Sequence, residues 1–143
     1  MNYMSDRCFV DTNVLVYAHD RDSVGKCERA RSLTQELWEG GNGALSTQVL
    51  QELYLSLRKK VIRPLSSLAA EQTLRDYFAW YLVINTPESI LRAVELESRY
   101  QVSFWDALIL QAAEVAQAEI LYSEDLNHRQ MYGSVRVVNP FLS

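Results

Sequence analysis

The sequence predicts an α/β fold in which helices cover both faces of a central parallel sheet of four or five strands, giving a three-layer α/β/α sandwich. Strand and helix signals alternate along the chain, with no repeat or low-complexity tract between them. Aspartates follow short apolar strands, at the end of a strand where open α/β sheets bind their ligands. With 143 residues, 48% of them hydrophobic, the chain has the size of one domain, so residues 1–143 are expected to form a single domain.

The N-terminal half carries signals for two strands and three helices. Ser23 is a good N-cap, and Gly40-Gly41 can end the helix that follows by supplying positive φ. Pro64 ends the last helical segment. In order, the expected elements are a strand at about 8–10, a helix at about 13–19, a helix between 23 and 41, a strand at about 44–46 and a helix at about 47–60.

The C-terminal half predicts three helices and three strands. Thr86-Pro87 is a strong helix start, because proline at the first helical position loses a hydrogen bond that would not be made anyway. A run at about 82–84 is too short for a helix and is expected to be a buried strand. The other elements are a helix from Ser66 or Ser67 that carries apolar residues as far as Tyr81, helices at about 87–100 and 103–116, the second nearly all apolar, and strands at about 119–122 and 135–138, the last stopped by Pro140.

Charge limits the ways in which this chain can bind a polyanion. Lysine and arginine number 14 against 18 acids, a net charge of −4, which excludes binding of nucleic acid by bulk positive charge. A polyanion would have to be bound by a local group of basic residues or through bound cations. The candidates are Arg58, Lys59, Lys60 and Arg63, which equally suit a solvated helix end facing the negative pole of the helix dipole, and Arg129.

The N-terminal residues and the cysteines indicate the setting of the protein. Residues 1–7 are polar, and the apolar stretch after them is broken by Asp11 and Asn13, so we expect neither a signal peptide nor a membrane span. Cys8 and Cys27 form neither a disulfide framework nor a zinc motif. A soluble, cytoplasmic protein is expected.

Four acids are candidates for a shared site, and each has a simpler interpretation. Asp11 can be an N-cap, and Asp106 fits a capping box with Ser103, although its apolar neighbours suggest a partly desolvated carboxylate in need of a partner. Asp125 follows an apolar strand, where aspartate is also an ordinary loop residue. Glu52 lies away from the apolar arc of its helix, so the pattern alone favours exposure to solvent.

Other polar and aromatic residues stay open at this point. Glu124 could compete with its neighbour as a ligand. His19 and His128 lack the context of a known metal or catalytic motif and are interpreted as surface or packing residues. Three aromatic residues at helical spacing favour core packing over a partner groove: Trp38, Tyr54 and Trp80.

Taken together, four segments resemble the motifs of PIN-domain nucleases, and among them most of all the VapC-like toxins of bacterial toxin-antitoxin pairs. The resemblance runs from about residue 7 to residue 138, and four motifs in the right order make it specific. The segments are Phe9-Val10-Asp11-Thr12-Asn13-Val14-Leu15, Gln51-Glu52-Leu53, Phe104-Trp105-Asp106-Ala107-Leu108-Ile109 and Tyr122-Ser123-Glu124-Asp125-Leu126.

The resemblance implies a PIN-like fold and an endoribonuclease that uses Mg²⁺ or Mn²⁺. It implies an acidic pocket of Asp11, Glu52, Asp106 and Asp125, in which Asp11 and Asp106 are the main metal ligands. Asn13 and Ser123 would be polar groups that support the acids or hold water. It also implies an RNA substrate, an antitoxin partner and a homodimer.

Three other functions stay open. A housekeeping RNA-processing nuclease would carry the same motifs as a toxin. A PIN-like scaffold could bind RNA or protein without cutting, although buried carboxylates without a role are costly. A phosphoryl-transfer enzyme could use Asp11 as a nucleophile, but the haloacid-dehalogenase type usually has a second aspartate where this chain has Asn13.

Overall fold

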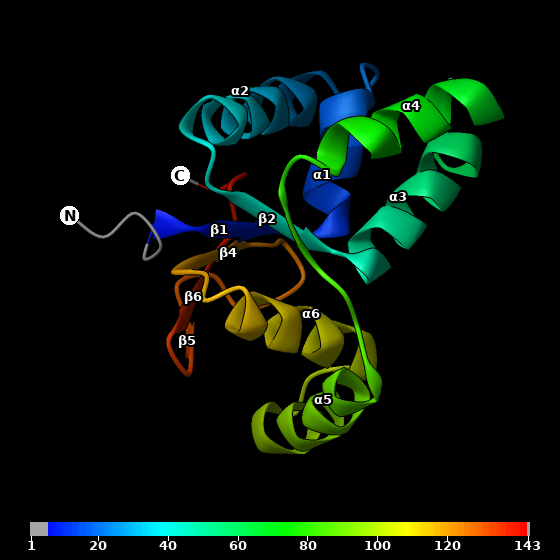
Figure 1. Ribbon diagram of the computed structural model, residues 1–143. Coiled ribbons are helices and arrows are strands. Elements are labelled where there is room, and N and C mark those ends of the chain that lie inside the picture. The colour runs from blue at the N-terminus through cyan, green and yellow to red at the C-terminus, as the bar shows by residue number, and fades with distance from the viewer. Residues whose placement is uncertain (1–5, 143) are drawn as a thin grey trace.

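A six-stranded sheet forms the centre of the computed structural model, which describes residues 6–142 (Figure 1). The expectation for residues 1–5, part of the polar N-terminal stretch, lies outside the described residues. The helices are α1 (Thr12–His19), α2 (Val24–Gly40), α3 (Thr47–Lys59), α4 (Ser67–Tyr77), α5 (Pro87–Tyr100) and α6 (Phe104–Val115). The strands are β1 (Cys8–Val10), β2 (Gly43–Ser46), β3 (Tyr81–Val83), β4 (Ile120–Tyr122), β5 (Met131–Tyr132) and β6 (Val135–Val138).

The sheet has the order β3-β2-β1-β4-β6-β5. The first five strands in this order pair in parallel, which confirms the predicted parallel sheet, and β5 is antiparallel to β6. The prediction missed β5 because it has two residues and returns through a two-residue turn at Gly133-Ser134, where Gly133 takes a φ of 62°.

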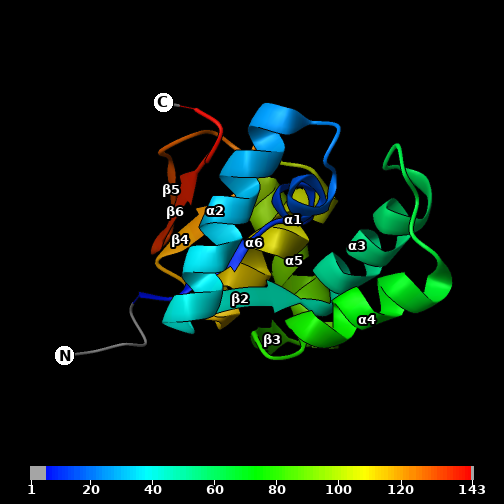
Figure 2. The ribbon, with the colours of Figure 1, turned by 90° about the horizontal axis from the view of Figure 1, so that it is seen from above.

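Helices cover both faces of the sheet, as predicted. Figure 1 shows α1 and α2 on one side and α5 and α6 on the other, and Figure 2 shows α2 lying across the strands. The central strand β1 is buried at each of its three residues, as expected for a parallel strand between two helical layers. Its carboxyl end, beside that of β4, is therefore a fixed point on which a site can be built.

Two details of the region around β3 differ from the prediction. The helix α4 ends at Tyr77, and Tyr81 belongs to the strand. The strand lies at the edge of the sheet, and of the expected buried strand at 82–84 only Val83 is buried, while Leu82 is half-buried and Ile84 is exposed. Trp80 lies between α4 and β3 and holds this connection in place. Its buried ring packs so closely on Gly43 of β2 that a Cβ atom at position 43 would come within 2.7 Å of the ring.

None of the helices in residues 6–142 is both long enough and apolar enough to cross a membrane.

Candidate functional site

Three of the four predicted acids meet at the carboxyl ends of β1 and β4. Asp11 follows β1 and caps α1, Asp125 lies in the loop after β4, and Asp106 lies in the first turn of α6. The backbone N–H of Asp11 donates to the carbonyl of Tyr122 at 2.9 Å, which holds the two strand ends together. One carboxylate oxygen from each of the three acids lies within 4.8 Å of the others.

Asp11 is the buried member of this group, 6% exposed. Its Oδ1 accepts from the backbone N–H of Thr12 at 2.7 Å, and its Oδ2 accepts from the Ser123 hydroxyl at 2.9 Å. Burial raises the pKa of Asp11 to about 7; these two hydrogen bonds oppose the rise, and the charges of Asp125 and Asp106 add to it. The N-cap interpretation of Asp11 is correct and is compatible with a ligand role, because each oxygen keeps a free lone pair.

Asp106 and Asp125 are more open to solvent. Burial raises the pKa of each, with the charges of Asp125 and Glu52 contributing at Asp106. Ser103 caps α6 by accepting from the Asp106 N–H at 3.1 Å, but within the described residues only α5 forms a reciprocal capping box. The Ser103 side chain also hydrogen-bonds the Asp106 carboxylate, which opposes the rise of its pKa, while one oxygen of that carboxylate stays within reach of the other acids.

The polar residues predicted beside the acids contact them. The Ser123 hydroxyl donates to Asp11 and accepts the backbone N–H of Asp125 at 3.1 Å, so one side chain ties two acids together. Asn13 donates from Nδ2 to Asp125 at 3.3 Å. These bonds fix the direction of two carboxylates before any ligand arrives.

Glu52 belongs to the same pocket but not to the group of three. Its Oε1 accepts from the Thr12 hydroxyl at 2.7 Å, and its side chain is half-buried, so the pattern-based expectation of a solvent-facing glutamate was wrong. The reason is that residues of α1 and α6 lie opposite the polar side of α3 and enclose it in the pocket. Four residues at intervals of four form a polar stripe on α3 that lines the pocket: Gln48, Glu52, Ser56 and Lys60.

The pocket has a volume of about 410 Å³. Three further residues that line the pocket were not predicted as site residues: Thr12, Gln48 and Ser56. The spacing of four residues that separates Gln48 and Ser56 from Glu52 was a usable signal for two of them. Gln48 is buried, donates to the Trp105 carbonyl at 3.4 Å, and has an Oε1 atom without a hydrogen-bond partner among the described residues. Gln48 thus places a buried oxygen without a partner at the wall of the pocket.

The basic residues that were predicted as candidates for binding a polyanion do not all lie at one site. Lys60 lines the acidic pocket. Arg58 donates to the Leu65 carbonyl at 3.0 Å, and Arg63 lies 3.7 Å from Asp22 in an exposed ion pair, so both have partners outside the acidic pocket. Lys59 is exposed in the last turn of α3, and Arg129 lies in a separate pocket with His128.

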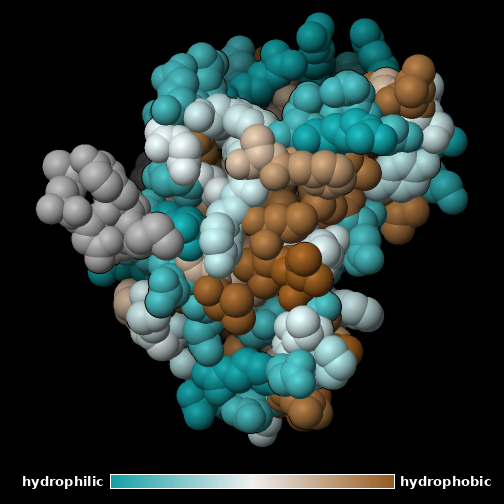
Figure 3. Space-filling view, in the orientation of Figure 1, coloured by the Kyte–Doolittle hydropathy of each residue, from teal (hydrophilic) through white to brown (hydrophobic). Residues whose placement is uncertain are grey.

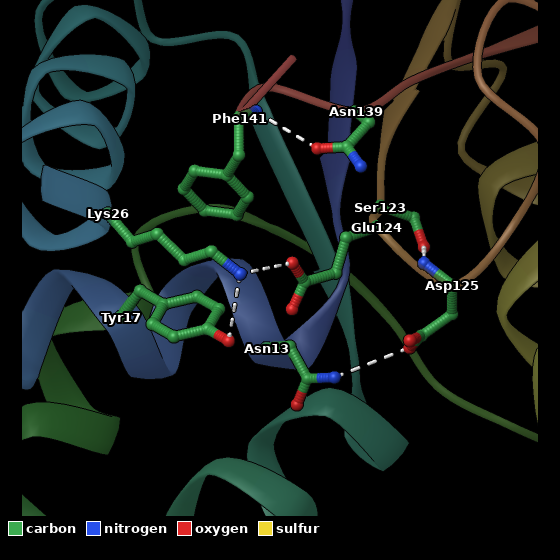
Figure 4. A network of polar contacts seen from close by, with 8 residues as sticks. All are labelled: Asn13, Tyr17, Lys26, Ser123, Glu124, Asp125, Asn139 and Phe141. Atoms are coloured by element: carbon green, nitrogen blue, oxygen red, sulfur yellow. Dashed lines mark hydrogen bonds and ion pairs between the residues drawn. The ribbon is translucent and has the colours of Figure 1, made fainter. Parts of the chain in front are cut away.

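Glu124, the possible competitor of Asp125, points to a different partner. Its Oε2 accepts from Lys26 Nζ at 2.9 Å, and the same ammonium group donates to the Tyr17 hydroxyl at 3.3 Å and lies over the ring of Phe141 (Figure 4). Asp125 faces the other way, toward Asn13. Lys26 therefore holds Glu124 away from the acidic group.

The histidines and the large aromatic residues lie outside the acidic pocket. His19 contacts the Tyr77 hydroxyl at 3.1 Å, and His128 accepts the backbone N–H of Asn139 at 2.9 Å, in agreement with packing roles. Trp38 and Trp80 pack against each other with ring centroids 5.4 Å apart.

Tyr54 differs from the two tryptophans because it lines an apolar groove between α3 and α4. The groove shares Leu55 with the acidic pocket. Figure 3 shows hydrophobic side chains gathered on this face, and the groove is lined by Thr47, Leu50, Gln51, Tyr54, Leu55, Leu74 and Phe78.

The donor set of the acidic pocket fits a hard divalent cation. Magnesium, manganese and calcium take oxygen ligands, above all carboxylates, and magnesium retains several waters while using one or two of them. Asp11, Asp106 and Asp125 supply such oxygens within one ion's reach, and a cation would relieve the cost of holding a buried carboxylate beside two others.

Comparison with known proteins gives one family match and two similar folds. The model of the PIN domain family matches residues 8–134, and no curated protein matches the chain. A toxin-antitoxin complex from Klebsiella pneumoniae has a chain of similar fold, with 19% identity, a TM-score of 0.66, and coverage of 93% of this chain and 97% of that one. The VapC20 toxin of Mycobacterium tuberculosis, which cleaves the sarcin-ricin loop, gives 20% identity, a TM-score of 0.64, and coverage of 82% and 89%.

Proposed function

This chain belongs to the PIN domain family, and from that premise we propose that it is an endoribonuclease that hydrolyses RNA phosphodiester bonds with the help of Mg²⁺ or Mn²⁺. The observation that carries the proposal is the meeting of three carboxylates within 4.8 Å at the carboxyl ends of β1 and β4. The family match makes a nuclease the expected use of such a group, and the raised pKa of Asp11 marks a carboxylate whose charged form is disfavoured by burial.

Asp11 and Asp106 are the proposed main ligands of the cation, with Asp125 completing the charge. When bound, the cation would supply positive charge to the phosphate and make a water molecule more acidic. Asn13 and Ser123 keep the carboxylates in position through the bonds to Asp125 and Asp11.

Glu52 and Lys60, which also line the pocket, are proposed to act on the attacking water and on the RNA. In hydrolysis the oxygen of water bonds to phosphorus, one bridging P–O bond breaks, the proton of the water must be accepted, and the leaving oxygen takes up a proton from solvent. Glu52 is the proposed group that orients this water and accepts the proton, because Thr12 occupies one of its oxygens and fixes the side chain. Lys60, at the end of the same stripe, would contact a phosphate of the strand.

We infer further that the protein is the toxin of a type II toxin-antitoxin pair, works in the cytoplasm and is a homodimer. The two solved structures of similar fold, both described as toxins or toxin complexes, support the toxin assignment. The apolar groove between α3 and α4 supports a protein partner that reaches the acidic pocket, because the two share Leu55. A short DNA-binding protein encoded beside this gene would favour the toxin over a housekeeping nuclease.

A cleavage assay on a mixed structured RNA tests the proposal. With Mg²⁺ or Mn²⁺ we expect endonucleolytic products, and with a chelator none. Asp106→Asn should lower the rate about a thousandfold or more, because a cation ligand contributes several kcal/mol to the transition state. The same variant should keep or gain thermal stability, since the raised pKa of Asp106 indicates a charge that the fold does not favour.

The alternatives give different results in this assay. A scaffold would bind the RNA without cutting it. A phosphoryl-transfer enzyme would trap a covalent phosphate on Asp11. Full metal-dependent activity in a folded Asp106→Asn protein would reject the site assignment.

A further inference from the structure

A second pocket, of about 480 Å³, lies between α2, β6 and the segments that precede β5 and follow β6. Three arginines line it, Arg29 from α2, Arg129 from the loop before β5, and Arg136 from β6, and no acid is among its lining residues. Arg29 of α2 donates to the Pro140 carbonyl in the segment after β6, so residues distant in the sequence form one surface. Together they concentrate positive charge in a chain whose net charge is −4.

The three guanidinium groups have no carboxylate partner within residues 6–142. The ion pairs of this part of the chain use Lys26, Arg63, Arg75 and Arg92 instead. Arg29 donates from Nε to the Pro140 carbonyl at 3.0 Å, which fixes its side chain while its two terminal nitrogens remain available. Guanidinium groups in this state present N–H donors in pairs, the arrangement that phosphate oxygens accept.

The backbone around Arg129 is held in an uncommon conformation. Its φ is 70°, a left-handed value that costs a side-chain-bearing residue about 1 kcal/mol or more. The N–H of Arg129 donates to the Val137 carbonyl at 2.7 Å, and the N–H of Val137 donates back to Gln130 at 3.0 Å. The loop is thus clamped on β6, where Arg136 and Val138 lie on the face that lines the pocket.

The position of this pocket connects it to the acidic one. Its lining includes Val138 and Asn139, at the carboxyl end of β6, and the Ser123 N–H donates to the Val138 carbonyl at 3.1 Å. Arg129 follows Asp125 by four residues, so their Cα atoms are at most about 14 Å apart. The carboxyl end of β6, which lines this pocket, is therefore bonded to the residue that ties Asp11 to Asp125.

We propose that the three-arginine pocket binds a backbone phosphate of the RNA, a short distance along the strand from the bond that is cut. The proposal rests on the proposed function. Four acids repel a polyanion, so the chain needs an anchor for the strand outside the acidic pocket, and the three arginines supply it. Free inorganic phosphate has the same chemistry as a ligand and is distinguished from RNA by the test.

The test uses the full chain and compares two double variants with the wild type. Arg129→Gln/Arg136→Gln removes two charges from the pocket; glutamine is tolerated at positive φ in this fold, since Gln101 and Gln117 both have a φ of 55°. Arg75→Gln/Arg99→Gln removes the same charge from α4 and α5. Circular dichroism and thermal unfolding establish that both variants are folded.

Three measurements are made on each protein. They are the Kd of a fluorescein-labelled single-stranded RNA in chelator as a function of salt, kcat and KM for cleavage in Mg²⁺, and the binding of inorganic phosphate by calorimetry. For the pocket variant we expect about a tenfold rise in Kd and KM with kcat nearly unchanged, and a salt slope smaller by about 1.4, since each lost phosphate contact of a single strand contributes about 0.7. The α4–α5 variant should match the wild type.

Each other result overturns the proposal in a recognisable way. An active wild type whose pocket variant has the same KM and salt slope rejects the anchor but leaves the nuclease intact. Loss of inorganic phosphate binding in calorimetry, with the RNA affinity unchanged, assigns the pocket to a free anion. A wild type that neither binds nor cuts RNA removes the proposed function, and this proposal with it.

Discussion

The acidic pocket and the three-arginine pocket adjoin the neighbouring strands β4 and β6 and are built in opposite ways. The first gathers carboxylates whose hydrogen bonds fix them, with Asp11 buried beneath. The second gathers arginines that have no carboxylate partner among the described residues. A buried anion is expected to respond to pH and to cations, whereas exposed cations are expected to respond to salt.

The largest expected effect is a decline in the stability of the metal-free protein with pH. In the unfolded chain the Asp11 carboxyl loses its proton near pH 4, but in the folded protein burial raises its pKa to about 7. Between these values the folded state binds more protons, so the free energy of unfolding falls as pH rises, by on the order of 4 kcal/mol in total.

Denaturant unfolding between pH 4 and 8, with chelator present, measures this decline. Asp11→Asn is the control, because the difference between the two proteins cancels the titration of other groups. Mg²⁺ should remove most of the wild-type decline, since a cation stabilises the ionised carboxylate. Identical pH profiles for wild type and variant would show that Asp11 titrates normally.

Charge reversal distinguishes Lys60, which lines the acidic pocket, from Arg63, which does not. Lys60→Glu adds a negative charge to the pocket lining and should raise KM for RNA about tenfold. Arg63→Glu makes the same change in net charge at an exposed ion pair outside the pocket and should alter KM less than about twofold. Steady-state cleavage kinetics at two salt concentrations provide the comparison, and equal effects would mean that only net charge matters.

The smallest effect is expected at the contact between Lys26 and Glu124. Lys26→Met should loosen the loop that carries Asp125, so that backbone amides at 123–126 exchange hydrogen a few times faster, in line with a partly exposed ion pair worth about 0.5 kcal/mol. Arg75→Met breaks a pair of the same 2.9 Å length with Glu71 and should leave this loop unchanged. Unaltered exchange after Lys26→Met would remove Lys26 from the support of the site.

The sequence predicted the parts of the site that depend on strand order. Asp11 and Asp125 each follow an apolar strand, and parallel strands bring such positions to one edge. The orientation of Glu52 could not be obtained from helical periodicity, because the walls of the pocket come from α1 and α6, which are distant in sequence.

The three-arginine pocket and the pairing of Glu124 with Lys26 were also beyond prediction. Arg29, Arg129 and Arg136 share no motif or period, and only the contact of α2 with the segment after β6 unites them. The strand β5 was missed for a similar reason, since two residues carry no pattern of their own.

Titration of the metal-free protein with Mn²⁺, followed by calorimetry, tests the central claim that the carboxylates of β1, β4 and α6 form one cation site. We expect saturable binding to the wild type and loss of that binding in folded Asp106→Asn. A wild type that binds no Mn²⁺, or a variant with the same affinity, would contradict it.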